Sequence, residues 1–184
     1  VERFGPSPRV LIVGAGLAPV IEGAPLGADQ YACDLDARAV EACRERYPWR
    51  ASRISLCPGP YELPAEPRDV DLVVAKEVIE HVDDPARFAA VLASRVRVGG
   101  ELALTTPNYG APWLLPLLER TALEWVARRD GFSRRDIHPS KFDEERLARL
   151  DAGPGMRLVE HVRTRTSWAL FARFRRVAPC SPSR

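Results

Sequence analysis

The sequence predicts an α/β fold, a three-layer sandwich built around a mostly parallel sheet. In the first half of the chain, short apolar runs alternate with amphipathic helical patterns. The first run, residues 10–13, leads directly into a glycine turn. Near the C-terminus, two further runs are separated by too few residues for a crossover helix, so we expect them to pair antiparallel.

The first five strands and the two helices between them follow from periodicity and from helix-boundary residues. The runs typical of strands are 9–14, 29–34, 52–57, 70–75 and 100–106, and the helical patterns are 36–47 and 85–96. Asp36 is a good N-cap for the first helix, and Pro85 stands where the first helical turn tolerates proline. We expect Gly99 and Gly100 to end the second helix before the fifth strand.

The C-terminal part of the chain predicts a cap insertion and the end of the sheet. Residues 107–140 interrupt the alternation with an apolar helix or helix pair, which we interpret as a cap over the carboxyl ends of the strands. A short helix near 143–151 then precedes strands at 156–164 and 167–176, which makes seven strands. Residues 1–178 are expected to form one domain and 179–184 a disordered tail.

Composition limits the classes of partner. The 184 residues carry 27 basic and 25 acidic side chains, a net charge of +2, so no overall field attracts nucleic acid or an anionic membrane. No apolar run approaches the length of a membrane span. The four cysteines lack Cys-x-x-Cys spacing, which favours reduced thiols and a cytoplasmic location. We expect a small-molecule partner, no membrane and no nucleic acid, and an oligomer is compatible with the sequence.

The first strand ends in a turn typical of an adenosine-cofactor site. Gly14 and Gly16 allow a sharp turn and a close approach of the backbone to a ligand. Asp34 follows about twenty residues later, where it can accept hydrogen bonds from ribose hydroxyls. Pro19 replaces the third glycine of a dinucleotide fingerprint and has no amide to offer a pyrophosphate. S-adenosylmethionine therefore fits better than a nicotinamide cofactor, which is the alternative from the turn alone.

Two later motifs give the chain a family resemblance. Residues 71–85 read DLVVAKEVIEHVDDP and residues 98–108 read VGGELALTTPN. Together with the glycine turn, in order, they resemble the seven-stranded Rossmann-like methyltransferases, in particular the group that contains the ubiquinone-biosynthesis O-methyltransferases and methyltransferase types 11 and 23. The resemblance covers roughly residues 9–108. It implies a seven-stranded, mostly parallel sheet with an antiparallel last strand, S-adenosylmethionine as cofactor, and methyl transfer.

The resemblance also assigns cofactor contacts. It implies that the methionine moiety lies against Gly14, Ala15 and Gly16, that the ribose binds Asp34, and that adenine packs on Leu35. By the same resemblance, the methyl group and the substrate lie beside Lys76 and Glu77.

Three positions depart from the family pattern. Ile12 stands where the family has an acid, Ala18 replaces a glycine, and Pro60 falls near the usual adenine-contacting acid. Our hypothesis is that Tyr61 and Glu62 replace that last contact.

Candidate catalytic groups follow from the chemistry of methyl transfer, which needs the acceptor aligned and deprotonated. His81 and His138 are the candidates for the base, whereas His161 lies in a predicted terminal strand and is interpreted as structural. If residues 77–81 are helical, Glu77, Glu80 and His81 share one face and form a candidate site for Mg²⁺ or Mn²⁺. The resemblance supports this metal site, because some ubiquinone-type and small-RNA 3′-terminal 2′-O-methyltransferases use a Glu-x-x-Glu-His arrangement.

The sequence thus predicts a methyltransferase that acts on a small molecule, at oxygen. In one alternative, a degenerate fold binds the cofactor or a partner protein without turnover. In the other, the chain is a metal-dependent RNA 3′-terminal 2′-O-methyltransferase, in which His138 completes the metal site and the arginines within 128–135 hold phosphates. For the small-molecule reading, Trp113 and Trp125 of the cap would line an apolar acceptor pocket.

Overall fold

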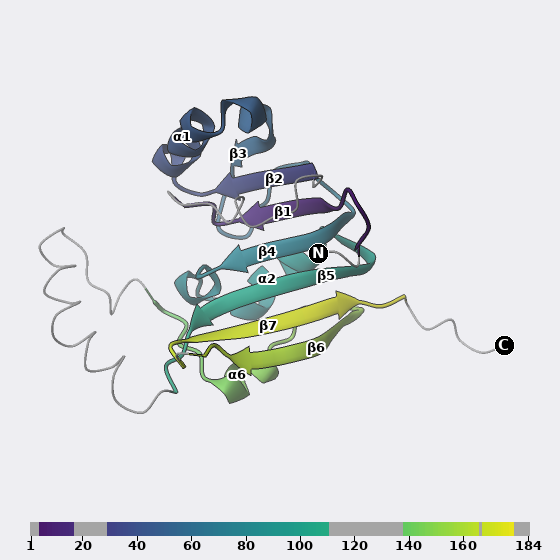
Figure 1. The fold of residues 1–184 in the computed structure, drawn as a ribbon. Coiled ribbons are helices and arrows are strands. Elements are labelled where there is room, and N and C mark those ends of the chain that lie inside the picture. The colour runs from purple at the N-terminus through teal and green to yellow at the C-terminus, as the bar shows by residue number, and fades with distance from the viewer. Residues whose placement is uncertain (1–3, 17–28, 111–137, 166, 179–184) are drawn as a thin grey trace, which may run out of the picture.

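The computed structural model describes residues 4–16, 29–110, 138–165 and 167–178. These residues form one seven-stranded sheet of order β3-β2-β1-β4-β5-β7-β6 (Figure 1). The first five strands pair in parallel, and β7 runs antiparallel to both β5 and β6, as predicted. The strands are β1 (Arg9–Val13), β2 (Asp29–Asp34), β3 (Ile54–Leu56), β4 (Val70–Lys76), β5 (Val96–Pro107), β6 (Met156–Arg163) and β7 (Ala169–Arg176).

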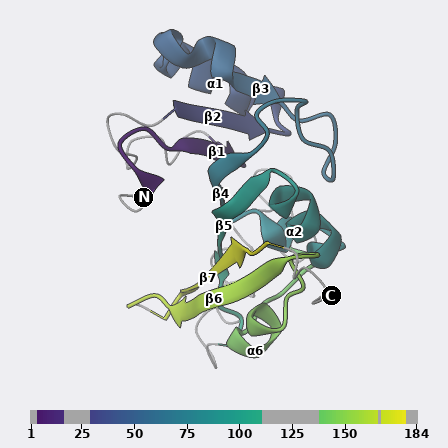
Figure 2. The ribbon, with the colours of Figure 1, turned by 90° about the vertical axis from the view of Figure 1, so that its right-hand side faces the viewer.

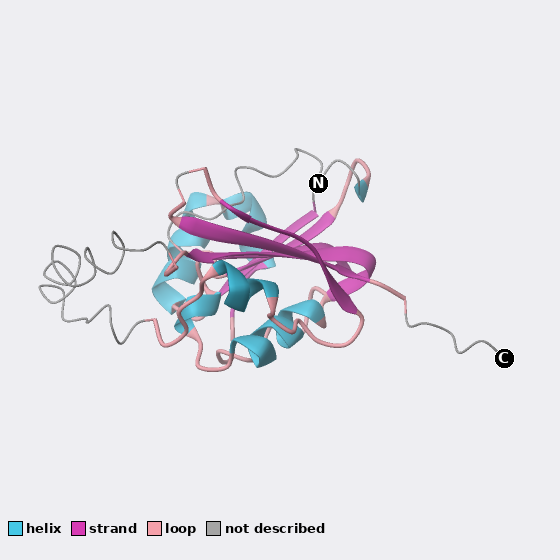
Figure 3. Ribbon diagram, turned by 90° about the horizontal axis from the view of Figure 1, so that it is seen from below, coloured by secondary structure: helices cyan, strands magenta, loops and turns pink. Residues whose placement is uncertain are grey.

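Helices pack on both faces of the sheet and produce two hydrophobic cores. In β1, Leu11 and Val13 point to one core, while Val10 and Ile12 point to the other, because successive side chains of a strand alternate between faces. The core around Leu11 lies under α2 (Pro85–Ala93) and α6 (Glu144–Ala148), and the core around Val10 lies under α1 (Ala37–Arg46). Figure 2 shows α2 and α6 on the same side, and Figure 3 views the twisted sheet nearly edge-on.

Aspartate caps begin the helices where the sequence predicts them. The Asp36 carboxylate accepts a hydrogen bond from the Arg38 amide at the start of α1. Pro85 is the first residue of α2, and the Asp84 carboxylate accepts a hydrogen bond from the Arg87 amide. Both helix starts are confirmed.

The fifth strand begins earlier than predicted. The helix α2 ends at Ala93, and β5 already pairs with β4 at Val96, before the two glycines. Gly99 and Gly100 therefore lie inside the strand, at a register shift, rather than between helix and strand. The reason is packing that periodicity does not reveal: Gly99 adopts a positive φ of 80°, and a Cβ on Gly100 would lie 2.9 Å from the Asp71 carbonyl oxygen.

A buried carboxylate fixes the antiparallel end of the sheet. Glu101 of β5 has no exposed surface, and its Oε1 accepts hydrogen bonds from Arg173 at 3.0 Å and from Arg175 at 2.9 Å. Both arginines belong to β7, and Arg175 is the register partner of Glu101. Because a buried charge without partners is costly, this arrangement favours the observed β5–β7 register.

Two 3₁₀ helices complete the described elements, η3 (Pro48–Arg53) before β3 and η4 (Ile79–His81) after β4. Most of the predicted cap, 111–137, lies outside the described residues, as does the tail, 179–184. In the described part of the chain, no helix has the length and apolarity needed to cross a membrane.

We predict that Gly100→Ala lowers the free energy of unfolding by about 1–3 kcal/mol, because the new Cβ would overpack against the Asp71 carbonyl and the Val96 side chain. Urea denaturation measures the effect. Gly59→Ala is the matched control, since a Cβ there meets only Glu62, at 3.9 Å, in ordinary contact. Equal stability of the two variants would contradict the close packing at Gly100.

Candidate functional site

The glycine turn after β1 packs against the chain that follows β4. The amides of Gly14 and Ala15 both donate to the Cys33 carbonyl at the end of β2, at 2.9 and 3.1 Å. Gly14 has a φ of 74°, and a Cβ at this position would clash with the Val78 side chain. Glycine is therefore required at position 14 both by the backbone conformation and by the approach of Val78.

Asp34 holds the glycine turn in place. Its Oδ2 accepts a hydrogen bond from the Gly16 amide at 2.7 Å, and its Oδ1 accepts one from the Asp36 amide at 2.9 Å. Each carboxylate oxygen can accept more than one hydrogen bond, so Asp34 retains acceptor capacity for ribose hydroxyls. The carboxylate thus has a structural role that the sequence did not reveal, in addition to the predicted ligand role.

A pocket of about 100 Å³ lies at the carboxyl ends of the parallel strands, where open α/β sheets bind ligands. Leu35 is 53% exposed although it is apolar, which suits a side chain that packs on a flat ring. The residues that line the pocket come from the ends of β1 and β2, from the loop after β3, from the segment after β4 and from α2: Val13, Gly14, Asp34, Leu35, Cys57, Gly59, Pro60, Leu63, Val78, His81, Val82 and Phe88.

The departures from the family pattern lie in different places. Ile12 is buried in the core under α1, and Pro60 lines the pocket, whereas Ala18 lies outside the described residues. The Tyr61 hydroxyl accepts a hydrogen bond from the Asp84 amide at 2.9 Å, so this residue joins the loop to the start of α2. The Glu62 amide donates to Gly59 within the same loop. Contacts of Tyr61 and Glu62 with a cofactor stay predictions.

Residues 77–81 do not form the α-helical face that the metal hypothesis assumed. Lys76 ends β4 with an exposed side chain, and Glu77 has a positive φ of 54°, which an α-helix does not allow. The Thr105 hydroxyl donates to Glu77 Oε1 at 3.0 Å, and the Glu77 amide donates to the Thr105 carbonyl at 3.0 Å. These two hydrogen bonds tie Glu77 to β5. The residues directly after it form the short η4 rather than an α-helix.

A different set of side chains comes together. Ligand atoms of Glu80, His81 and His138 all lie within 4.8 Å of one another, and Glu77 is not part of this group. The His81 and His138 rings meet edge to face, with centroids 4.6 Å apart. The structure thus brings together both candidate catalytic histidines, although they are 57 positions apart in the chain.

Glu80 is the electrostatically unusual member of the group. Its side chain is 1% exposed, and within the described structure its Oε2 has no hydrogen-bond partner. Burial raises the pKa of Glu80 to about 7, and the neighbouring Glu77 carboxylate contributes to the rise. Such a group is typical of functional sites, where it can bind a cation or exchange a proton near neutral pH.

Tyr109 also belongs to this site, and sequence reasoning missed it. Its hydroxyl lies 2.5 Å from His138 Nδ1. The one sequence signal is its place directly after Asn108, at the carboxyl end of the fifth strand. His161, by contrast, lies in β6 opposite Ala172 with an exposed side chain, and its structural role stays a prediction.

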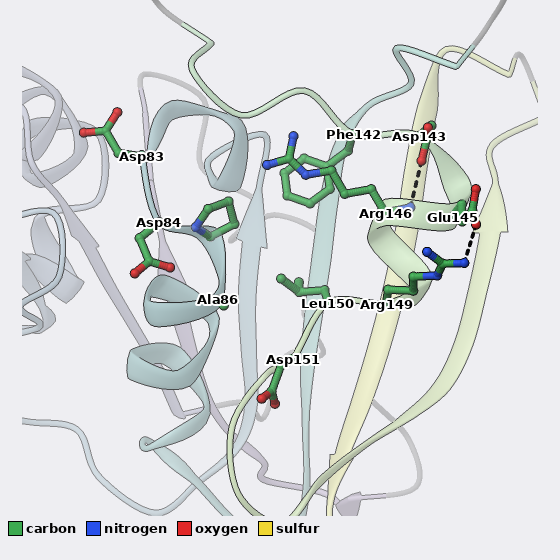
Figure 4. Close-up of a pocket in the computed structure, with 11 residues that line it drawn as sticks. Asp83, Asp84, Ala86, Phe142, Asp143, Glu145, Arg146, Arg149, Leu150 and Asp151 are labelled. Carbon is green, nitrogen blue, oxygen red and sulfur yellow. Dashed lines mark hydrogen bonds and ion pairs between the residues drawn. The ribbon is translucent and has the colours of Figure 1, made fainter.

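A larger pocket, of about 540 Å³, lies elsewhere and has no predicted site residue in its lining (Figure 4). It opens between the start of α2 and α6, with the Arg146 guanidinium 4.9 Å from the centre of the Phe142 ring. Several of its charged groups are already engaged with protein: Asp143 caps α6, and Arg149 pairs with Glu145. We therefore place the candidate site at the smaller pocket beside His81.

The fold and the glycine turn agree with a comparison against protein families. The model described as "Methyltransferase domain" matches residues 11–104, just over half of the chain. The chain belongs to this methyltransferase family. The match runs from β1 to β5 and includes the glycine turn, Asp34 and the Glu80–His81 pair.

Part of this chain also aligns with curated methyltransferases. A probable S-adenosylmethionine-dependent methyltransferase of Mycobacterium tuberculosis is 39% identical over 95 residues, 47% of this chain and 33% of the relative. The mitochondrial ubiquinone biosynthesis O-methyltransferase of Schizosaccharomyces pombe is 32% identical over 124 residues, 65% of this chain and 44% of the relative. The chain thus spans about a third to a half of the length of these relatives.

Solved structures confirm the class I methyltransferase fold. An S-adenosylmethionine-dependent methyltransferase from Aquifex aeolicus superposes with a TM-score of 0.66 over 96% of this chain and 87% of that one, at 15% identity. A Haemonchus contortus phosphoethanolamine N-methyltransferase in complex with S-adenosylmethionine gives 0.68, over 95% of this chain and 50% of that one, at 15% identity. A methyltransferase from Haloferax volcanii, solved with the activator Trm112, gives 0.69 over 93% and 83%, at 15% identity.

We predict that Glu80→Gln changes how stability depends on pH. Because the pKa of Glu80 is raised in the folded state, the unfolded chain releases this proton first as pH rises from about 4.5 to about 7. The free energy of unfolding of wild type therefore falls by up to roughly 3 kcal/mol over this pH range, whereas that of Glu80→Gln does not fall for this reason. Urea denaturation in chelator at pH 4 to 8 measures the difference.

The surface variant Glu45→Gln, on α1, controls for removing one carboxylate from the chain. Stability curves of wild type and Glu80→Gln that stay parallel from pH 4 to 8 would contradict a pKa of Glu80 that is raised by burial.

Proposed function

We propose that the protein transfers a methyl group from S-adenosylmethionine to a hydroxyl group of a small molecule. The observation that carries this proposal is the shared wall of the pocket: Asp34 and Leu35, the proposed ribose and adenine contacts, line it together with His81. A candidate base thus lines the same pocket as the proposed cofactor contacts. Membership of the methyltransferase family and the S-adenosylmethionine-bound structural relative support the choice of cofactor.

The reaction is an in-line displacement. The acceptor oxygen gives its proton to a base and attacks the methyl carbon, while the carbon–sulfur bond breaks and its electron pair returns to sulfur as S-adenosylhomocysteine. Lys76 and Glu77, at the end of β4, are the proposed neighbours of the methyl group. His81 or His138 would take the proton, a role that typically contributes about 10²–10⁴-fold to such a reaction.

The group Glu80, His81 and His138 also fits a divalent cation. The unpartnered Glu80 oxygen offers a buried anionic ligand, and two imidazoles favour Mn²⁺ over Mg²⁺. A bound cation would lower the pKa of an acceptor hydroxyl. Within the described residues, the proposed ligand set is therefore Glu80, His81 and His138 rather than Glu77, Glu80 and His81.

Participation of His138 is also what the RNA alternative requires, so an RNA 3′-terminal hydroxyl is the second candidate acceptor. The basic residues within 128–135 that would bind its phosphates lie outside the described structure. The relatives named as ubiquinone biosynthesis O-methyltransferases support a small-molecule hydroxyl as the first choice of acceptor. Both acceptor classes belong in one assay, which measures S-adenosylhomocysteine released from each.

We predict that the protein binds S-adenosylmethionine and S-adenosylhomocysteine in calorimetric titration and that Asp34→Ala weakens both by roughly 10- to 100-fold, the value of a charged hydrogen bond. Glu41→Gln, on the exposed face of α1, is the control and should bind as wild type does. NAD is the control ligand.

Absence of binding by wild type would support the non-catalytic alternative. Binding that is unaffected by Asp34→Ala would place the ribose elsewhere.

We predict that Mn²⁺ binds wild type and Glu77→Gln with equal affinity. Binding is measured by the loss of the electron-paramagnetic-resonance signal of free Mn²⁺. Glu80→Gln and His138→Ala should each weaken binding, because they remove ligands from the group that the structure brings together. A loss confined to Glu77→Gln would restore the ligand set expected from the sequence. If none of the proteins binds Mn²⁺, the histidines act without a metal and the cation is removed from the proposal.

A further inference from the structure

The contact between Tyr109 and His138 is the most specific side-chain interaction at the candidate site. The Tyr109 oxygen lies 2.5 Å from His138 Nδ1, and both side chains are half-buried. The two residues reach this place from different parts of the chain, Tyr109 directly after β5 and His138 from the segment that precedes α6.

The backbone around Tyr109 is held on both sides. Its amide donates to the Phe142 carbonyl at 2.8 Å, and the preceding Asn108 amide donates to the Trp168 carbonyl at 2.8 Å. Asn108 is 3% exposed, and its Oδ1 accepts a hydrogen bond from the Gly110 amide at 3.0 Å. The phenol is therefore presented to His138 by a fixed backbone rather than by a free surface side chain.

The ring of Tyr109 has a second contact that does not involve its hydroxyl. The Lys141 ammonium lies 5.3 Å from the ring centre, a cation–π distance. Replacement of the tyrosine by phenylalanine keeps this contact and the ring, and removes only the oxygen. The chain thus offers a substitution that isolates the hydrogen bond to His138.

The partner at Nδ1 decides what the other nitrogen of His138 can do. A neutral imidazole carries its proton on one nitrogen and a lone pair on the other. With Nδ1 directed at Tyr109, Nε2 is the remaining polar atom of the ring, which packs against His81 in the group with Glu80. Only an Nδ1-protonated ring has a lone pair on Nε2 that can take a proton or bind a cation.

We propose that Tyr109 is a positioning residue, whose oxygen accepts the Nδ1–H of His138 and so keeps the Nε2 lone pair available at the candidate site. This inference rests on the proposed function, because it makes His138 competent to receive the acceptor proton. Tyr109 itself touches neither cofactor nor acceptor in this role. If the site binds a metal ion, the same arrangement is needed, because a nitrogen that binds a metal also needs a lone pair.

The test is Tyr109→Phe, examined first by nuclear magnetic resonance of protein labelled with ¹⁵N-histidine, at a pH where the imidazoles are neutral. His138→Gln assigns the His138 signals. We expect His138 to be protonated at Nδ1 in wild type and to shift toward the Nε2-protonated form, which free histidine prefers in water, in Tyr109→Phe. Tyr31→Phe, whose hydroxyl contacts Arg9 on β1, is the matched control and should leave the His138 signals unchanged.

The second measurement is turnover with the acceptor found in the release assay. Tyr109→Phe should lower kcat about 10- to 100-fold, the usual effect of removing a partner that orients a functional histidine, with unchanged KM for S-adenosylmethionine. An Nε2-protonated His138 in wild type, or no change of tautomer in Tyr109→Phe, overturns the inference. A shifted tautomer with unchanged kcat also overturns it.

Failure of the proposed function has a different signature. It appears as wild type that binds no S-adenosylmethionine or releases no S-adenosylhomocysteine, whatever the His138 signals show.

Discussion

The close contact between Gly14 and Val78 is the constraint on which the candidate site depends. A Cβ at position 14 would clash with the Val78 side chain, so the glycine turn and the segment after β4 pack directly against each other. The register of the sheet brings the two segments close together, because Val13 pairs with Ala75 on one side and with Cys33 on the other. Three strand ends therefore stand at one level. The candidate pocket, with His81 in its lining, lies where these strand ends meet.

Two buried glutamates show how the molecule separates scaffold from site. Glu101 and Glu80 are almost equally inaccessible, at 0% and 1% exposure. Glu101 accepts hydrogen bonds from two arginines of β7, as a structural buried charge must. Glu80 faces an imidazole at 4.0 Å and keeps one oxygen without a partner in the described structure. Among the described residues, no arginine pairs with Glu80 as two do with Glu101, and a buried carboxylate of this kind is typical of functional sites.

Local sequence patterns were sufficient for the succession of strands along the chain and for the starts of α1 and α2. Buried apolar runs mark β1 and β4, and capping residues mark α1 and α2, because these signals depend only on neighbours in the chain. The start of β5 at Val96 was not predictable, since it depends on pairing with Val70 in another strand.

The candidate site, too, has a part that local sequence patterns predict and a part that depends on contacts between distant segments. The glycine turn and Asp34 were predictable, because their spacing can be recognised in the sequence itself. The positive φ of Glu77 and the hydrogen bond between Tyr109 and His138 depend on contacts with β5 and across 29 positions of sequence. The expectation of a helix at residues 77–81 therefore predicted Glu77 as a ligand. The structure instead groups Glu80 and His81 with His138, from a distant segment.

The segment that carries His138 is held in place without its histidine. The Ser140 amide donates to the Glu80 carbonyl at 3.2 Å, and the Ser140 hydroxyl donates to the Val82 carbonyl at 2.8 Å. Ser140 is 1% exposed, so these bonds are shielded from water. Ser140 thus contributes to docking of the segment, while the proposed chemistry at its start depends on His138 and Tyr109. Because the two tasks belong to different residues, substitution at His138 or Tyr109 can change proton transfer and leave the segment docked beside η4.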